Sequence, residues 1–298
     1  MDTANEATIT IATDSNLTDE MISKAEIIFG GPRQDVLKRA KNLKWLQLYS
    51  AGADGYTDSD HLYMSKDILL TTSSGVYGRA ISEHVLAMIL SYNRNLQDYA
   101  LLKQEKRWSS IYKTRDFYGS TVGIIGFGDI GNEVALRAKA LGARVLVVKR
   151  ILSKKPDYVD EIYLTEEIDE VLGRSDYIVL TLPATEKTKG IISKERIGIM
   201  KPDAFLVNIG RGELIDQEAL IEALRNNRIG GAGLDVMTPE PLPADNPLWE
   251  LPNVIITQHS SGLSVGNDTR RVNLFTDNLR RYLNNEALEN IVNFTEGY

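Results

Sequence analysis

Short apolar runs alternate with helical patterns of apolar and polar residues along nearly the whole chain. This alternation is typical of parallel strands joined by helices, so it predicts an α/β fold with helices covering parallel sheets. In the first third of the chain, the apolar runs predict strands at 9–12, 27–29, 45–48 and 68–71. A more regular later series predicts strands at 122–125, 145–148, 177–180, 205–208, 231–235 and 254–257.

Helices are predicted where apolar residues recur at a spacing of three to four. A long helix is expected over 81–92, and the pattern resumes after an interruption toward Trp108. Further helices are expected over 132–141 and 267–283. The segment 239–247 holds four prolines in nine residues, so it is predicted to be a loop.

Composition narrows the possible classes of protein. The length of 298 residues is typical of two domains. A formal net charge of −7 argues against broad affinity for nucleic acids or anionic membranes, so we expect neither as a partner. The absence of cysteine excludes disulfides, thiolate metal sites and a cysteine nucleophile. The start of the chain lacks a secretory pattern and no apolar run could span a bilayer, so a cytoplasmic location is expected.

A glycine-rich turn lies between a predicted strand and a predicted helix, in the pattern G-x-G-x-x-G. Such a turn lets the backbone approach a pyrophosphate, and the helix N-terminus attracts the anion. The pattern alone could be an ordinary glycine-rich turn, but the succession of strand, turn, helix and strand favours dinucleotide binding. The candidate cofactor contacts in this turn are Gly126, Gly128, Asp129, Ile130 and Gly131.

A basic pair, Lys149-Arg150, ends the second strand of this series, and Lys154-Lys155 follows shortly after. An acid at this position would accept hydrogen bonds from a free ribose 2′-hydroxyl, whereas cations suit a 2′-phosphate. The sequence therefore predicts that NADP(H) is preferred and that NAD(H) remains possible. The alternative is a solvated basic strand end that holds the adenosine loosely.

Three ionisable residues, Arg211, Glu240 and His259, lie at or just after the ends of predicted strands. In an open parallel sheet these ends share one edge with the glycine turn, so the three side chains can converge. An arginine can hold a carboxylate and polarise a carbonyl, a histidine can donate a proton, and a glutamate can orient the histidine. This set suits reduction of a 2-oxo acid by hydride from a nicotinamide, which requires no metal. Taken singly, each residue could instead be an ordinary surface or strand-end residue.

At these residues the chain resembles the D-isomer-specific 2-hydroxyacid dehydrogenases, and the resemblance covers nearly all of it. The matching motifs occur in the family's order: the glycine turn, Asn208-Ile-Gly-Arg211-Gly, Gly233-Leu-Asp235-Val, Glu240-Pro-Leu-Pro and His259-Ser-Ser-Gly262. The resemblance implies that Arg211 binds substrate, that His259 is the acid/base and that Glu240 is its partner.

The resemblance also assigns residues to the two ligands. Asp235 would help to hold the nicotinamide carboxamide, and the segment 181–183 would lie beneath the adenosine and ribose. Outside the glycine turn, the expected cofactor contacts are Lys149, Arg150, Thr181, Leu182, Pro183, Ile209, Asp235 and Gly262. The expected substrate contacts are Ala51, Gly52, Gly75, Val76, Arg211 and His259.

The same resemblance predicts two Rossmann-like or flavodoxin-like domains with the active site in the cleft between them. The substrate domain would comprise residues 1–94 and 268–298, and the dinucleotide domain residues 95–267. Members of the family are usually homodimers built around an arm, which here would span 95–117. His84, on the helix expected between the domains, is interpreted as a packing residue.

Two departures and three alternatives complete the prediction. The basic pair replaces the acid typical of NAD-using members, and Gln258 stands where a proline usually precedes the histidine. The main alternative is a narrow glyoxylate/hydroxypyruvate reductase. A nucleotide-sensing protein like the corepressors that share the fold is a second. A formate dehydrogenase is disfavoured because such enzymes carry an amide where this chain has Glu240.

Overall fold

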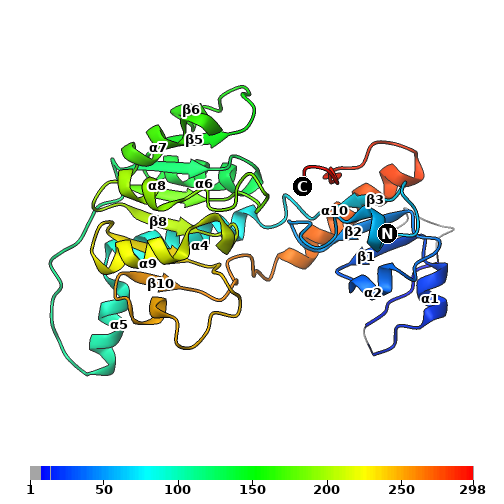
Figure 1. The fold of residues 1–298 in the computed structure, drawn as a ribbon, viewed down its shortest axis with the longest axis horizontal. Helices are drawn as coiled ribbons and strands as arrows, with labels where there is room; N and C mark the ends of the chain where they lie inside the picture. Colours follow the sequence, from blue (N-terminus) through cyan, green and yellow to red (C-terminus); the bar gives the residue numbers. More distant parts are fainter. Residues whose placement is uncertain (1–7, 14, 298) are drawn as a thin grey trace. The chain divides into compact units, whose positions relative to one another are not determined.

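The computed structural model describes residues 8–13 and 15–297, which divide into two compact units (Figure 1). The first unit combines the described residues up to Tyr77 with those from Ser264 onward, and the second is Gly78–Leu263. The sequence division placed residues 78–94 in the first domain. In the structure this segment forms helix α4 (Gly78–Asn93), which contacts α6, β8 and β9, so it belongs to the second unit.

The second unit is built on a seven-stranded sheet of parallel strands in the order β10-β9-β8-β7-β4-β5-β6. Its central strands are buried along their whole length, as expected for a parallel sheet with helices on both faces. The strands are β4 (Thr121–Ile125), β5 (Arg144–Lys149), β6 (Glu161–Leu164), β7 (Tyr177–Leu180), β8 (Phe205–Asn208), β9 (Gly231–Leu234) and β10 (Val254–Ile256).

Helices α4 and α5 precede the sheet, later helices connect its strands, and α8 and α9 begin at polar caps. Asp216 accepts a hydrogen bond from the backbone N–H of Ala219 at 3.0 Å, which starts α9. Besides α4, the helices are α5 (Leu96–Gln104), α6 (Asp129–Ala140), α7 (Ile168–Arg174), α8 (Lys194–Ile199) and α9 (Gln217–Arg225). Short 3₁₀ turns are η1 (Thr165–Glu167), η2 (Gly212–Leu214) and η3 (Pro247–Glu250).

The strand order of the second unit reverses between β4 and β7. From β4 the chain adds β5 and β6 on one side, and then returns to add β7, β8, β9 and β10 on the other. In such sheets a ligand binds beyond the carboxyl ends of the strands at the point of reversal. We call this side of the sheet, where β4, β5, β7, β8, β9 and β10 end, the carboxyl edge.

The first unit contains a three-stranded parallel sheet in the order β1-β2-β3. The C-terminal helix packs on it, with the ring of Phe275 stacked 4.3 Å from Phe29 and 5.4 Å from Trp45. The strands are β1 (Ile27–Gly30), β2 (Trp45–Leu48) and β3 (Leu69–Thr71). The helices are α1 (Asp19–Lys24), α2 (Gln34–Leu37), α3 (Ser59–Leu62) and α10 (Asn267–Leu283).

Most predicted strands are confirmed to within two residues, and two differences have physical reasons. The strand predicted at 9–12 is wrong: residues 8–13 hold no strand, and Ile9 and Ile11 are 81% and 85% exposed. The strand β6 was missed because it lies at the end of the sheet, where only Tyr163 of its four residues is buried. It therefore lacks the continuous apolar run that marked the central strands.

A cluster of charged residues links β6 to β5 and α7. Glu161 accepts hydrogen bonds from Arg174, at 2.8 Å, and also from Tyr163 and Arg144. These bonds, led by that from Arg174, lower the pKa of Glu161 to about 2 from an ordinary value of 4.5. The stabilisation is therefore present above pH 4.5 and is lost as the pH falls toward 2.

Glu161→Gln is accordingly expected to lower Tm at pH 7 by about 2 °C, because a partly exposed ion-pair network contributes modestly. The difference from the parent should shrink as the pH falls below 4.5. Thermal melts of both proteins at pH 7, 4 and 2.5 measure it. An equal difference at all three pH values would show that the charge of Glu161 is not the source of the stabilisation.

Candidate functional site

The glycine turn has the geometry that its sequence predicts. Gly126 adopts a φ of +104°, and a Cβ there would lie 3.1 Å from the backbone nitrogen of Leu182. At Gly131 a Cβ would lie 2.2 Å from the carbonyl oxygen of Gly126, so only glycine allows the start of α6 to pack on the turn. At Gly128, the N-cap of α6, a Cβ would meet nothing within 4 Å, so the backbone there is open to a ligand.

Neighbouring turns along the carboxyl edge contact one another. Thr181, just after β7, donates its hydroxyl hydrogen to the carbonyl oxygen of Gly126 at 2.6 Å. A Cβ at Gly210, just after β8, would lie 2.6 Å from the carbonyl oxygen of Leu182. The turns after β4, β7 and β8 thus form one continuous surface.

Lys149, the first residue of the predicted basic pair, lies beside the glycine turn. The Lys149 ammonium, at the end of β5, lies 5.6 Å from the centre of the Phe127 ring, within the turn. It also donates to the hydroxyl of Ser153 at 2.6 Å. Lys155 instead donates to the carbonyl oxygen of Val159 at 2.7 Å. The structure therefore brings Lys149 to the glycine turn, whereas Lys155 is hydrogen-bonded within its own loop.

The predicted acid/base pair is in direct contact. His259 Nδ1 lies 2.8 Å from Glu240 Oε2, while Glu240 Oε1 accepts the backbone N–H of Met237 at 3.0 Å. Because an ionised carboxylate can only accept hydrogen bonds, Nδ1 is the donor and Nε2 is left for another partner. The His259 side chain is 54% exposed, so this second nitrogen is accessible to a ligand.

Arg211 follows β8 in a turn that the buried Asn208 shapes. Asn208 accepts from the backbone N–H of Gly210 at 3.1 Å and donates to the carbonyl oxygen of Arg211 at 2.9 Å. A Cβ at Gly212 would lie 2.1 Å from the carbonyl oxygen of Met237, so the turn packs directly against the segment that leads to Glu240. Arg211 and Glu240 therefore come from adjoining loops of the carboxyl edge.

Asp235 is fully buried at the end of β9 and holds the loop that carries His259. Its carboxylate accepts the backbone N–H groups of Ser260 and Ser261 at 2.9 and 3.0 Å, and also the hydroxyl of Thr257. Burial alone would raise the pKa of Asp235. The hydrogen bonds from Ser261, Thr257 and the backbone outweigh it and lower the pKa, so the group is ionised at neutral pH.

Sequence reasoning missed several residues of this network. Thr257 ends an apolar run, and Ser260 and Ser261 follow His259 in the quoted motif, but none of these three positions indicated a contact with Asp235. His84 was interpreted as a packing residue, yet its Nε2 lies 3.0 Å from the hydroxyl oxygen of Thr257. The two residues are 173 positions apart, so no local pattern could have paired them.

The predicted substrate loops lie in the first unit and are joined to each other. Ser73 donates its backbone N–H to the carbonyl oxygen of Ser50 at 2.8 Å and its hydroxyl to that of Leu48 at 2.6 Å. Arg270 Nε donates to the carbonyl oxygen of Val76 at 2.8 Å. The loops 50–52 and 73–76 therefore form one braced structure.

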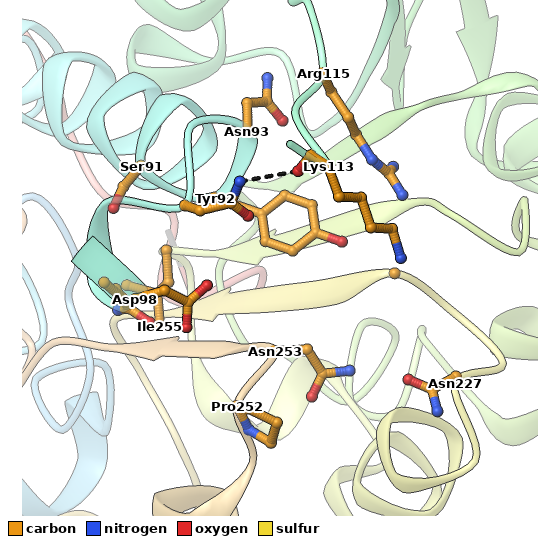
Figure 2. A pocket seen from close by; sticks show the side chains of 13 residues that line it. Ser91, Tyr92, Asn93, Asp98, Lys113, Arg115, Asn227, Pro252, Asn253 and Ile255 are labelled. Carbon is orange, nitrogen blue, oxygen red and sulfur yellow. Dashed lines mark hydrogen bonds between the residues drawn. The ribbon is translucent and has the colours of Figure 1, made fainter. Parts of the chain in front are cut away.

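A pocket of about 240 Å³ lies away from these groups (Figure 2). Its lining includes Tyr92, Arg115, Gly230 and Asn253, and the last two immediately precede β9 and β10. It therefore opens at the side of the sheet opposite the carboxyl edge and includes none of the predicted site residues.

Two negative findings apply to residues 8–13 and 15–297. In that part of the chain, no three His, Cys, Asp or Glu side chains gather so that they could hold a metal ion. Within the same residues, no helix is both long and apolar enough to cross a membrane.

Known proteins resemble this chain over most of its length. It is 34% identical over 261 residues to D-3-phosphoglycerate dehydrogenase of Methanocaldococcus jannaschii, covering 87% of this chain and 49% of that one. The chain thus spans about half the length of that relative. It is 32% identical over 265 residues to glyoxylate reductase of Korarchaeum cryptofilum, covering 87% and 79%.

Solved structures give the same result. A D-isomer-specific 2-hydroxyacid dehydrogenase from Xanthobacter autotrophicus, in complex with NADPH and MES, superposes with a TM-score of 0.81. It is 29% identical, and the match covers 93% of this chain and 86% of that one. Residues 86–261, more than half of the chain, match the family model described as "D-isomer specific 2-hydroxyacid dehydrogenase, NAD binding domain". The chain therefore belongs to the D-isomer-specific 2-hydroxyacid dehydrogenase family.

Proposed function

We propose that this protein uses NAD(P)H to reduce small 2-oxo acids to D-2-hydroxy acids. The observation that carries the proposal is the hydrogen bond of 2.8 Å between His259 and Glu240, on the carboxyl edge that also holds the glycine turn. An imidazole held by a carboxylate suits proton donation to an alkoxide, and the glycine turn suits a dinucleotide.

Each of the three charged residues has a separate role in this reaction. His259 Nε2 donates the proton that the substrate oxygen needs as it becomes an alkoxide. Glu240 fixes the ring through Nδ1 and stabilises its charged form. Arg211 binds the substrate carboxylate and polarises the carbonyl. The nicotinamide, when bound, supplies the hydride.

The cofactor is assigned to the second unit, along the carboxyl edge. The open backbone at Gly128 and the N-terminus of α6 suit the pyrophosphate. Lys149 suits the 2′-phosphate of NADPH, because its ammonium lies beside the glycine turn. Strands β5 and β10, at the two ends of this edge, are five strand spacings apart, or roughly 24 Å, so the ligand must lie extended.

The substrate is assigned to the braced loops 50–52 and 73–76 of the first unit, together with Arg211 and His259. Backbone N–H groups in such loops suit a carboxylate. The similarity to a glyoxylate reductase favours glyoxylate and hydroxypyruvate as a narrower alternative to a broad range of 2-oxo acids.

Initial rates test both versions of the proposal. Glyoxylate, hydroxypyruvate, pyruvate and phenylpyruvate are each offered with NADPH and with NADH, and cofactor absorbance is followed. Turnover of all four supports a broad reductase, and turnover of the first two alone supports the narrow one. A folded protein that binds cofactor but reduces none of them would contradict the proposed function.

Lys149→Ala is expected to lower kcat/KM for NADPH by roughly 10- to 100-fold, because one charge-assisted contact to the 2′-phosphate is lost. The value for NADH should change little, since NADH lacks that phosphate. Lys155→Ala is the matched control, because the Lys155 ammonium is bonded to Val159. An unchanged NADPH/NADH ratio in Lys149→Ala would remove this residue from cofactor selection.

We further propose that the chain forms a homodimer through the arm 95–117. The arm exposes Trp108 and Tyr112, whose relative exposures are 102% and 91%. Apolar and aromatic surface of this kind is typical of an interface.

Replacing Trp108 and Tyr112 together by serine is expected to shift a dimer to monomer, because the double change removes the two most exposed aromatic side chains of the arm. Light scattering after size exclusion measures the mass. Ile151→Ser, an exposed apolar residue of the same unit outside the arm, is the control. A dimer that survives the double substitution would place the interface elsewhere.

A further inference from the structure

We propose that His84 is a positioning residue for His259, acting through Thr257 and Asp235; the inference rests on the proposed function of His259. His84 Nε2, on helix α4, lies 3.0 Å from the Thr257 hydroxyl oxygen. The Thr257 hydroxyl in turn donates to the Asp235 carboxylate. All four residues belong to the second unit.

The direction of these hydrogen bonds follows from counting protons. The ionised carboxylate of Asp235 can only accept, and a hydroxyl group carries one hydrogen. The hydrogen of Thr257 is therefore committed to Asp235, so the Thr257 oxygen must accept from its other neighbour. His84 must then carry a proton on Nε2, which fixes its tautomer in the neutral ring.

Asp235 connects Thr257 to the loop that carries the catalytic histidine. Its carboxylate accepts the backbone N–H groups of Ser260 and Ser261, and its carbonyl oxygen accepts the N–H of His259 at 2.8 Å. Three consecutive residues of the catalytic loop are thus bound to one buried aspartate.

The loop needs this restraint because of the backbone at His259. Its φ is +49°, in the left-handed region that residues other than glycine rarely adopt. The conformation places Nδ1 within 2.8 Å of Glu240 and leaves Nε2 for the substrate. If Thr257 could rotate, Asp235 would lose one of the donors that fix its carboxylate, and the His259 loop would lose its rigid anchor.

A packing role for His84 makes different predictions from a hydrogen-bonding role. Packing depends on volume, so His84→Met should then be tolerated better than His84→Gln. A hydrogen bond depends on the donor, so an amide that reaches Thr257 should serve better than methionine. At Thr257, serine keeps the hydroxyl, whereas valine keeps only the shape.

We therefore compare His84→Met and Thr257→Val with His84→Gln and Thr257→Ser. The two variants without the hydrogen-bonding group, His84→Met and Thr257→Val, are expected to lower kcat about tenfold or more, with cofactor Kd nearly unchanged. The two variants that keep such a group are expected to recover most of that loss. The double variant His84→Met/Thr257→Val should be no slower than Thr257→Val alone, because both act through one chain of bonds. The proposal would be overturned if the kcat losses of His84→Met and Thr257→Val multiplied in the double variant. It would also be overturned if His84→Gln and Thr257→Ser lost as much kcat as His84→Met and Thr257→Val.

Nitrogen NMR of the imidazole rings supplies a readout that does not depend on turnover. The chain has three histidines, so His61→Gln and the variants above assign every ring signal. His61, which pairs with Asp58 in the first unit, also serves as the control for activity. In the parent, His84 is expected as the Nε2–H tautomer or the doubly protonated ring, and Thr257→Val should shift the His259 signals. A His84 ring protonated only on Nδ1, or unshifted His259 signals in Thr257→Val, would overturn the proposal even if no 2-oxo acid were reduced. If no 2-oxo acid is reduced, the proposed function fails, and the NMR result decides the role of His84 independently.

Discussion

His259→Ala is expected to lower kcat by roughly two to four orders of magnitude while the affinity for cofactor persists. The substitution removes the group whose Nε2 is accessible and whose Nδ1 is fixed by Glu240 at 2.8 Å. The cofactor contacts proposed at Gly128 and Lys149 lie just after β4 and at the end of β5, away from the β10 end of the carboxyl edge. Single-turnover reduction at saturating cofactor, with cofactor Kd measured separately, distinguishes the two effects.

Two further variants sharpen this result. Glu240→Gln keeps the shape of the side chain but removes the charge that favours imidazolium, so an intermediate loss of about 10- to 100-fold is expected. His61→Gln, which removes a histidine of α3 with no proposed role in the reaction, should have no effect. Full activity in His259→Ala would remove this residue from the mechanism.

Local sequence patterns were sufficient for the parts of the fold that are locally determined. The strands β2, β7 and β8 occur at the predicted residues, because each is a short apolar run buried on both faces. The segment 9–12 shows the limit of this reasoning. Its apolar residues have the composition of a strand, but they lie exposed and unpaired with the sheet. An apolar run becomes a strand only where a neighbouring strand accepts its hydrogen bonds.

The same distinction between locally determined and long-range features applies to the candidate site. The glycine turn and the Glu240–His259 contact could be predicted, because each motif occupies a strand end and the ends of parallel strands share one edge. The bond between His84 and Thr257 could not, because it joins helix α4 to the residue just after β10, 173 positions away in the sequence. A threonine at the end of an apolar run is consistent with many environments. Only the three-dimensional arrangement shows that Thr257 lies between His84 and Asp235.

Arg211→Ala is expected to raise KM for the 2-oxo acid and to lower kcat as well, with a combined loss in kcat/KM of about a thousandfold or more. The two effects arise together because the guanidinium would hold the substrate carboxylate in the ground state and polarise the carbonyl as its oxygen gains charge. The turn that carries Arg211 is set by Asn208 and packed against Met237, so the backbone should survive the loss of the side chain.

Arg211→Lys tests which property of arginine matters. Lysine keeps the charge but not the planar fork of donors, so it should recover part of the binding and little of the turnover. Initial rates over a range of 2-oxo acid concentration, at saturating cofactor, separate KM from kcat. A loss confined to cofactor affinity would contradict the role proposed for Arg211. Full recovery by lysine would show that charge alone is required, and that the carbonyl is oriented by other groups such as the loops 50–52 and 73–76.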